Sequence, residues 1–117
     1  MKKHFYSHLI ELEPILTTLD EIVISDKNKK ELLSIVEITT HYLVTDVVLS
    51  ELPEADKKKF LHFLARNEHG KIWDLISKKI DNIEDKIRIA VRDVHLSMID
   101  DAKKIVRNKK GVKNNER

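Results

Sequence analysis

Two histidines and a glutamate near the amino terminus have a spacing that could bind a divalent metal ion. His4 and His8 lie one helical turn apart, and Glu11 follows on the same side of a helix through this segment. Two imidazoles and a carboxylate can hold such an ion with coordination positions left open. A single terminal helix supplies no partners that would fix the imidazole tautomers. We therefore expect these side chains to form a solvated flank, with no metal and no cofactor bound.

A second candidate lies near the other end of the chain, where six residues separate Arg88 from His95, with Asp93 among them. An imidazole can transfer protons and a guanidinium can stabilise charge during cleavage of a phosphodiester. The spacing resembles that of the helical ribonucleases of toxin–antitoxin systems, and this resemblance implies those roles for His95 and Arg88. That family has a polar residue after the arginine, where this chain has Ile89. The alternative is that both residues border an apolar core.

The end of the chain is strongly basic. Residues 107–117 contain Glu116 and five basic residues, Arg107, Lys109, Lys110, Lys113 and Arg117. With Val112 as the one apolar side chain, this stretch buries too little surface to offset chain entropy, so we expect a flexible tail. Contacts with phosphates would give the tail a salt-sensitive affinity for nucleic acid. No aromatic residues are interleaved as stacking platforms, so nucleic-acid binding is the alternative function.

The composition excludes several other classes of protein. The chain has 117 residues, of which 41% are apolar and 36% charged, enough for one domain with a modest core. It has no cysteine, which excludes disulfides and thiolate chemistry. Two glycines and two prolines are too few for the turns of an all-β protein. No apolar run exceeds three residues, so we expect no membrane-spanning helix and a cytoplasmic location.

Apolar spacings of three and four residues predict helices along most of the chain. From Phe5 to Val23 one apolar stripe keeps its phase through Pro14, which predicts a helix kinked there or, alternatively, a short helix that restarts at the proline. A turn and cap at residues 25–28 precede a helix over 29–50. Further helices are predicted from Pro53 to about residue 67, over residues 72–80 and over residues 83–106.

The segment 29–50 is apolar around most of a helical circumference. One stripe consists of Leu32, Val36, Leu43 and Val47, and a second, displaced by more than a quarter turn, consists of Ile35, Ile38, Tyr42 and Leu49. Many residues from 35 to 49 are β-branched, which favours a strand, but no other segment looks like a partner strand. We therefore predict a helix that is either central to the fold or part of an interface.

Residues 52–87 contain three short motifs: Leu52-Pro53-Glu54, Lys71-Ile72-Trp73 and, at residues 79–84, Lys-Ile-Asp-Asn-Ile-Glu. In these motifs the segment resembles a family of small, uncharacterised bacterial helical domains. In that family a Leu-Pro-Glu helix start leads to a short helix with Trp or Phe and to a capped turn. This chain departs from the pattern at Asp81, where the family more often has proline. The resemblance implies an all-helical fold and no particular activity.

Together these patterns predict one all-α domain at residues 1–106, built as a four- to five-helix bundle or an irregular helical array, and a disordered basic tail at 107–117. We expect a protein–protein interaction or self-associating module without catalytic activity. The expected homodimer interface consists of apolar residues outside the main stripes: Ile35, Ile38, Tyr42, Leu49, Ile89 and Leu96. The alternative is that one of these helices is simply central to the monomer.

Overall fold

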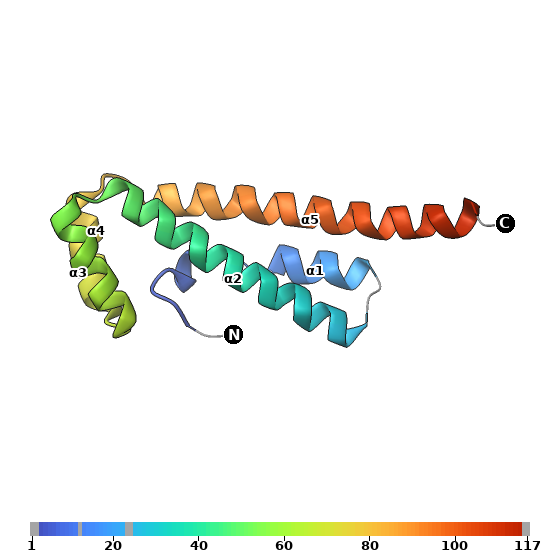
Figure 1. Ribbon diagram of the computed structural model, residues 1–117, viewed down its shortest axis with the longest axis horizontal. Helices are drawn as coiled ribbons and strands as arrows, with labels where there is room; N and C mark the ends of the chain where they lie inside the picture. The colour runs from blue at the N-terminus through green and yellow to red at the C-terminus, as the bar shows by residue number, and fades with distance from the viewer. Residues whose placement is uncertain (1–2, 12, 23–24, 116–117) are drawn as a thin grey trace.

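The chain folds into helices, as a computed structural model shows (Figure 1). The structure describes residues 3–11, 13–22 and 25–115, with side chains up to Lys104. The elements are η1 (Ser7–Leu9), α1 (Glu13–Glu21), α2 (Asp26–Glu51), α3 (Glu54–Ala65), α4 (His69–Lys79) and α5 (Ile83–Asn115). No strand occurs among the described residues, and the predicted all-α fold is confirmed.

Two long helices, α2 and α5, form the frame and run antiparallel beside each other (Figure 1). The buried residues of α2 recur every four positions, at Val36, Thr40, Val44 and Val48. This interval keeps them on one face of the helix. Of the predicted stripe only Val36 is fully buried, while Leu32, Leu43 and Val47 are half-buried. The prediction of a helix over residues 29–50 is confirmed, and a strand here is excluded.

The main core lies where α3 and α4 pack across one end of the long helices (Figure 1). Phe5 of the N-terminal segment (residues 3–11) is buried there and meets the rings of Phe60 and Trp73 edge-on, at centroid distances of 5.9 and 5.7 Å. The indole Nε1 of Trp73 donates a hydrogen bond of 2.8 Å to the Phe5 carbonyl oxygen. These contacts fix the N-terminal segment against the body of the protein.

A second, smaller core joins α1 to the frame. Ile15 and Leu19 of α1 are buried against Val36 of α2, with Met98 and Ile99 of α5 packed around them. Figure 1 shows α1 between the two long helices, away from α3 and α4. The position of α1 therefore depends on two buried side chains, one helical turn apart.

The amino-terminal half of the first predicted helix is not an α-helix. The prediction of one kinked helix is wrong, and the alternative of a helix that restarts at the proline is confirmed. Pro14 is the second residue of α1, where a missing backbone donor costs nothing. Ile10 is extended, with φ −106° and ψ 127°, so η1 and α1 are separate elements. Ser25 is the N-cap of α2, because its hydroxyl accepts a hydrogen bond from the Asn28 N–H, so the cap lies within the predicted residues 25–28 but the helix begins at Asp26, earlier than predicted.

Sharp turns join the last three helices. Asn67 and Asn82, which precede α4 and α5, both have φ 56°, a left-handed conformation that asparagine tolerates better than most residues. The backbone of α5 then continues as helix to Asn115, beyond the predicted domain end at Val106. The side chains of the five basic tail residues lie outside the described residues, and the flexibility of this tail stays a prediction.

The composition of α2 also meets the criteria for a membrane-spanning helix. A window of 18 residues has a mean hydropathy of 1.5, and 22% of it is buried in the fold. The mean hydropathy averages over all residues of the window. Along α2, however, polar residues interrupt the apolar ones, so that no apolar run exceeds three residues. Glu37 and Asp46 lie within α2, and a carboxylate at the centre of a bilayer costs about 2.5–3.5 kcal/mol. Length and composition alone therefore do not place α2 in a membrane.

Candidate functional site

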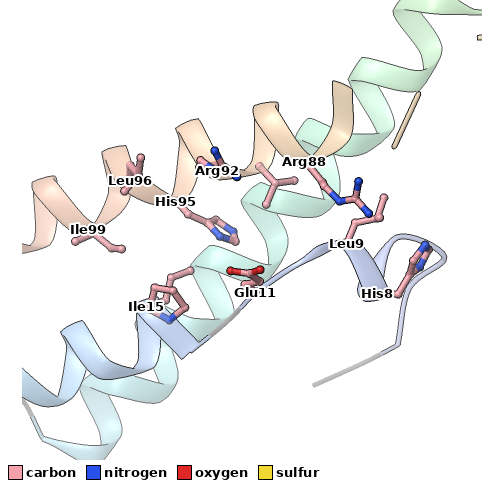
Figure 2. Close-up of a pocket in the computed structure, with 11 residues that line it drawn as sticks. His8, Leu9, Glu11, Ile15, Arg88, Arg92, His95, Leu96 and Ile99 are labelled. Atoms are coloured by element: carbon pink, nitrogen blue, oxygen red, sulfur yellow. The ribbon is translucent and has the colours of Figure 1, made fainter. Parts of the chain in front are cut away.

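A groove of about 340 Å³ lies between the N-terminal segment and α5 (Figure 2). Buried apolar side chains from η1, α1 and α5 form its floor. Polar side chains from both sequence candidates line it: His8 and Glu11 from the first, Arg88 and His95 from the second. Residues far apart in the sequence thus meet in one place, because η1 and α1 both pack against α5.

Two arginines stand one helical turn apart along the groove. Arg88 pairs with carboxylates of its own helix, at 3.3 Å from Asp85 and 3.7 Å from Glu84. Arg92 forms no ion pair within the described part of the chain. Arg92 was not a sequence candidate, although its position four residues after Arg88 places it on the same side of a helix.

His95 lies at the base of the groove and is 7% exposed. A hydrogen bond of 2.9 Å joins its Nε2 to Oγ1 of Thr40 on α2. Burial lowers the pKa of His95, because desolvation penalises the charged imidazolium. The roles in phosphodiester cleavage stay a prediction. In this geometry one ring nitrogen of His95 is hydrogen-bonded to Thr40, and the Arg88 guanidinium is paired with carboxylates of its own helix.

The three candidate metal ligands do not converge. His4 stacks on Tyr6, with ring centroids 5.0 Å apart, and its Nε2 lies 3.5 Å from Oε1 of Glu37 on α2. His8 instead packs against the Trp73 ring at 5.3 Å. Among the residues that the structure describes, no group of three or more histidine, aspartate and glutamate side chains has the geometry of a metal site.

His4 belongs to a cluster that attaches the N-terminal segment to α2. The Tyr6 hydroxyl and Nδ1 of His41 form a hydrogen bond of 3.1 Å, and the His4 and His41 rings lie 4.8 Å apart. Burial, with a smaller contribution from the Glu37 carboxylate, raises the pKa of Tyr6 above its ordinary value. Tyr6 therefore keeps its proton. No spacing in the sequence points to this cluster, because its members belong to distant segments.

The structure places five of the six predicted interface residues at the surface. Their exposed fractions are 51% for Ile35, 54% for Ile38, 72% for Tyr42, 59% for Ile89 and 58% for Leu96. Leu49 is half-buried and packs against the main core. These residues do not form one patch, because those on α2 and those on α5 lie on different sides of the helix pair.

The exposed apolar residues of α2 and α5 lie on the far sides of two helices that face each other. Thr40 faces α5, and Ile35, Ile38 and Tyr42 lie roughly 140–160° around the helix from it. On α5, positions 89 and 96 lie roughly 140–160° from the buried Val91. One isologous contact cannot cover both sets, so only one of them can form a twofold interface.

The outer face of α2 is a regular row of exposed side chains, here called the α2 stripe: Lys27, Glu31, Ile35, Ile38, Tyr42 and Asp46. Their intervals of three and four residues keep them in line. Within the described residues, none of the three charged members takes part in an ion pair. The stripe is thus apolar at its centre and charged at its ends.

Comparisons with protein-family models, with curated proteins and with solved structures find no significant match to this chain. The resemblance of residues 52–87 to an uncharacterised helical family stays a prediction.

Proposed function

We propose that this protein is a self-associating helical module that forms a homodimer through the α2 stripe. The observation that carries the proposal is the exposure of Ile35, Ile38 and Tyr42, each more than half exposed at the centre of a helix. The opposite face of α2 is already occupied by α5 and the N-terminal segment. A row of exposed apolar side chains flanked by charged residues is typical of an interaction site.

The order of charges along the stripe favours a second copy in the antiparallel direction. Lys27 lies at one end and Asp46 at the other, about 29 Å apart along the helix axis. With a twofold axis beside residues 36 and 37, Lys27 of each copy faces Asp46 of the other. A parallel pair would instead place like charges together, at a cost in free energy.

The same axis brings the apolar residues into register. Ile35 of each copy then meets Ile38 of the other, and Tyr42 lies beside Glu31, whose carboxylate can accept a hydrogen bond from the phenol. A contact one helix wide and about 29 Å long is smaller than the standard interface of about 1,600 Å². We therefore expect a weak, reversible dimer with a Kd on the order of 10–100 μM.

Sedimentation equilibrium of the full chain, from about 1 μM to about 1 mM, tests this proposal. The mass should rise from 13.7 kDa towards twice that value. Ile38→Asp should hold the protein at the lower mass, because it places two carboxylates in an apolar contact. Leu61→Asp is the matched control, since Leu61 is 46% exposed on α3, away from the stripe.

Three results would contradict the proposal. One is a wild-type chain that stays at 13.7 kDa throughout the concentration series. Another is an equal loss of association in the Leu61→Asp control. The third is co-sedimentation of the monomer with phosphatidylcholine vesicles that Ile38→Asp abolishes, which would identify lipid as the occupant of the stripe.

A further inference from the structure

We propose that the groove between the N-terminal segment and α5 binds small organic anions that have an apolar body, with Arg92 holding the anionic head group. The groove is separate from the α2 stripe, so this inference is independent of the proposed function. Its volume of about 340 Å³ is at the lower end of the range for ligand pockets, roughly 300–1,000 Å³. The ligand is therefore small.

The floor of the groove suits an apolar body. Leu9, Ile15 and Val91 are buried beneath it, with exposed fractions of 7%, 3% and 3%. Leu96 and Ile99 form the wall on α5, and Leu96 is 58% exposed. A ligand lying against this wall would cover the exposed part of the Leu96 side chain. Removal of this apolar surface from water favours binding.

The charges that line the groove favour an anion. Arg88 and Arg92 stand against one carboxylate, that of Glu11, and burial lowers the pKa of His95 at the base of the groove, which favours its neutral form. Arg88 is already paired with Glu84 and Asp85, whereas Arg92 has no ion pair among the described residues. Its guanidinium donors can bind a carboxylate or a phosphate in a bidentate manner. Arg92 is therefore the anchoring residue.

Two further groups on the groove would respond to a bound anion. Glu11 lies on the loop before α1 and projects into the groove from the wall opposite α5 (Figure 2). Its carboxylate opposes an anion, so its neutralisation should strengthen binding. His95 lies at the base, and a negative charge nearby favours the imidazolium, which raises the pKa of His95.

A carboxylate and a phosphate ester share the chemistry that Arg92 recognises, so the experiment uses both as probes. The ¹H–¹⁵N NMR spectrum of the full chain is recorded with octanoate and, separately, with hexyl phosphate. For each probe we expect saturable shifts at the amides of Val91, Arg92 and Leu96. Stronger binding of one probe assigns the head group. Hexanol, which has an apolar body and no charge, should bind at least fivefold more weakly.

Three variants locate the contact. Arg92→Gln should weaken binding of the anions at least fivefold, and Glu11→Gln should strengthen it about twofold. Arg66→Gln is the matched control, because Arg66 is an exposed arginine near the end of α3, 3.9 Å from Glu68 and outside the groove. The pKa of His95, followed from its ring protons, should rise when octanoate is present and stay unchanged with hexanol.

The proposal fails if groove amides do not shift at 10 mM of either anion, or if hexanol binds as well as octanoate. It also fails if Arg92→Gln and Arg66→Gln weaken binding equally, since the contact would then be general electrostatic attraction. Shifts centred on Ile35 and Ile38 would show adsorption to the α2 stripe and would likewise contradict a site in the groove.

Discussion

Oγ1 of Thr40 and Nε2 of His95 lie 2.9 Å apart within the contact between α2 and α5. Both side chains are buried, with exposed fractions of 3% and 7%. On α2 the buried positions on either side of Thr40 are Val36 and Val44, so this is a polar bond among apolar neighbours. Removal of one partner leaves a buried polar atom unsatisfied, which costs more than the net contribution of the bond.

Thr40→Val should therefore destabilise the protein although valine has almost the same shape. We expect the free energy of unfolding to fall by about 1–3 kcal/mol, the cost of an unsatisfied buried nitrogen on His95. Replacement of both partners, in Thr40→Val/His95→Leu, should recover most of that loss. Urea denaturation followed by circular dichroism measures both values. A double variant no more stable than Thr40→Val would contradict this account.

Burial of His95 also makes stability depend on pH. The unfolded chain has an ordinary histidine pKa of about 6.5, and burial lowers the pKa in the folded state. Below about pH 6.5 the unfolded state therefore binds more protons, and the free energy of unfolding falls as the pH decreases towards the folded-state pKa. The stabilisation is fully present above about pH 6.5.

Urea denaturation at pH 5, 6, 7 and 8 tests this dependence. The wild type should lose stability between pH 7 and pH 5, and Thr40→Val/His95→Leu should lose less, because it lacks the buried imidazole. The difference between the two proteins isolates His95 from the other histidines. Equal losses in both would assign the pH dependence to groups other than His95.

Most helix positions were predictable from the sequence because their apolar residues recur at helical intervals. The N-terminal segment was not, since its conformation depends on contacts with residues far along the chain. Trp73 donates its hydrogen bond to the Phe5 carbonyl oxygen, 68 residues away in sequence, and Tyr6 reaches His41 across 35 residues. Periodicity within a short window carries no information on such pairs.

The sequence predicted which residues belong to the candidate site better than it predicted how they are arranged in space. His8, Glu11, Arg88 and His95 were identified by residue type and spacing, as parts of two unrelated sites. Their meeting in one groove depends on how α1 packs between α2 and α5, which is a tertiary property. Thr40 could not be identified from the sequence either, because its burial requires the partner on α5.

Charge reversal tests the antiparallel direction of the proposed dimer. Lys27→Asp should weaken association at least fivefold, because the new carboxylate at position 27 would then face Asp46 of the second copy at both ends of the contact. The double variant Lys27→Asp/Asp46→Lys should restore association by exchanging the charges. Sedimentation equilibrium measures each value. In a parallel dimer like charges would still face each other in the double variant, so a failure to restore association would contradict the antiparallel arrangement.

The basic tail provides the test of the alternative function. Its five basic residues predict weak binding of RNA that decreases steeply between 50 and 200 mM salt. A chain truncated after Val106 should lose this binding, as measured by fluorescence anisotropy with a labelled single strand. Binding that survives truncation would contradict a role for the tail. The RNA should stay intact, and cleavage that His95→Ala abolishes would favour the ribonuclease alternative instead.

A small cavity of about 50 Å³ between α1, α2 and α5 offers a test of packing in the second core. Val36 and Ala102 line it from α2 and α5, and His95 borders both this cavity and the groove. Val36→Ile adds one methylene group that the cavity can hold. We expect the free energy of unfolding to increase by about 0.5–1 kcal/mol, since burial of a methylene contributes about 0.8 kcal/mol.

Val44→Ile is the matched control for this substitution, because Val44 is 0% exposed in the main core and does not line the cavity. The same added methylene should there be overpacked and destabilise the protein by about 1–3 kcal/mol. Urea denaturation of the two variants compares one chemical change at two sites. If Val36→Ile destabilises the protein as much as Val44→Ile does, the cavity beside Val36 cannot accept the added methylene group. The position of α1 would then be held more tightly than its two buried residues imply.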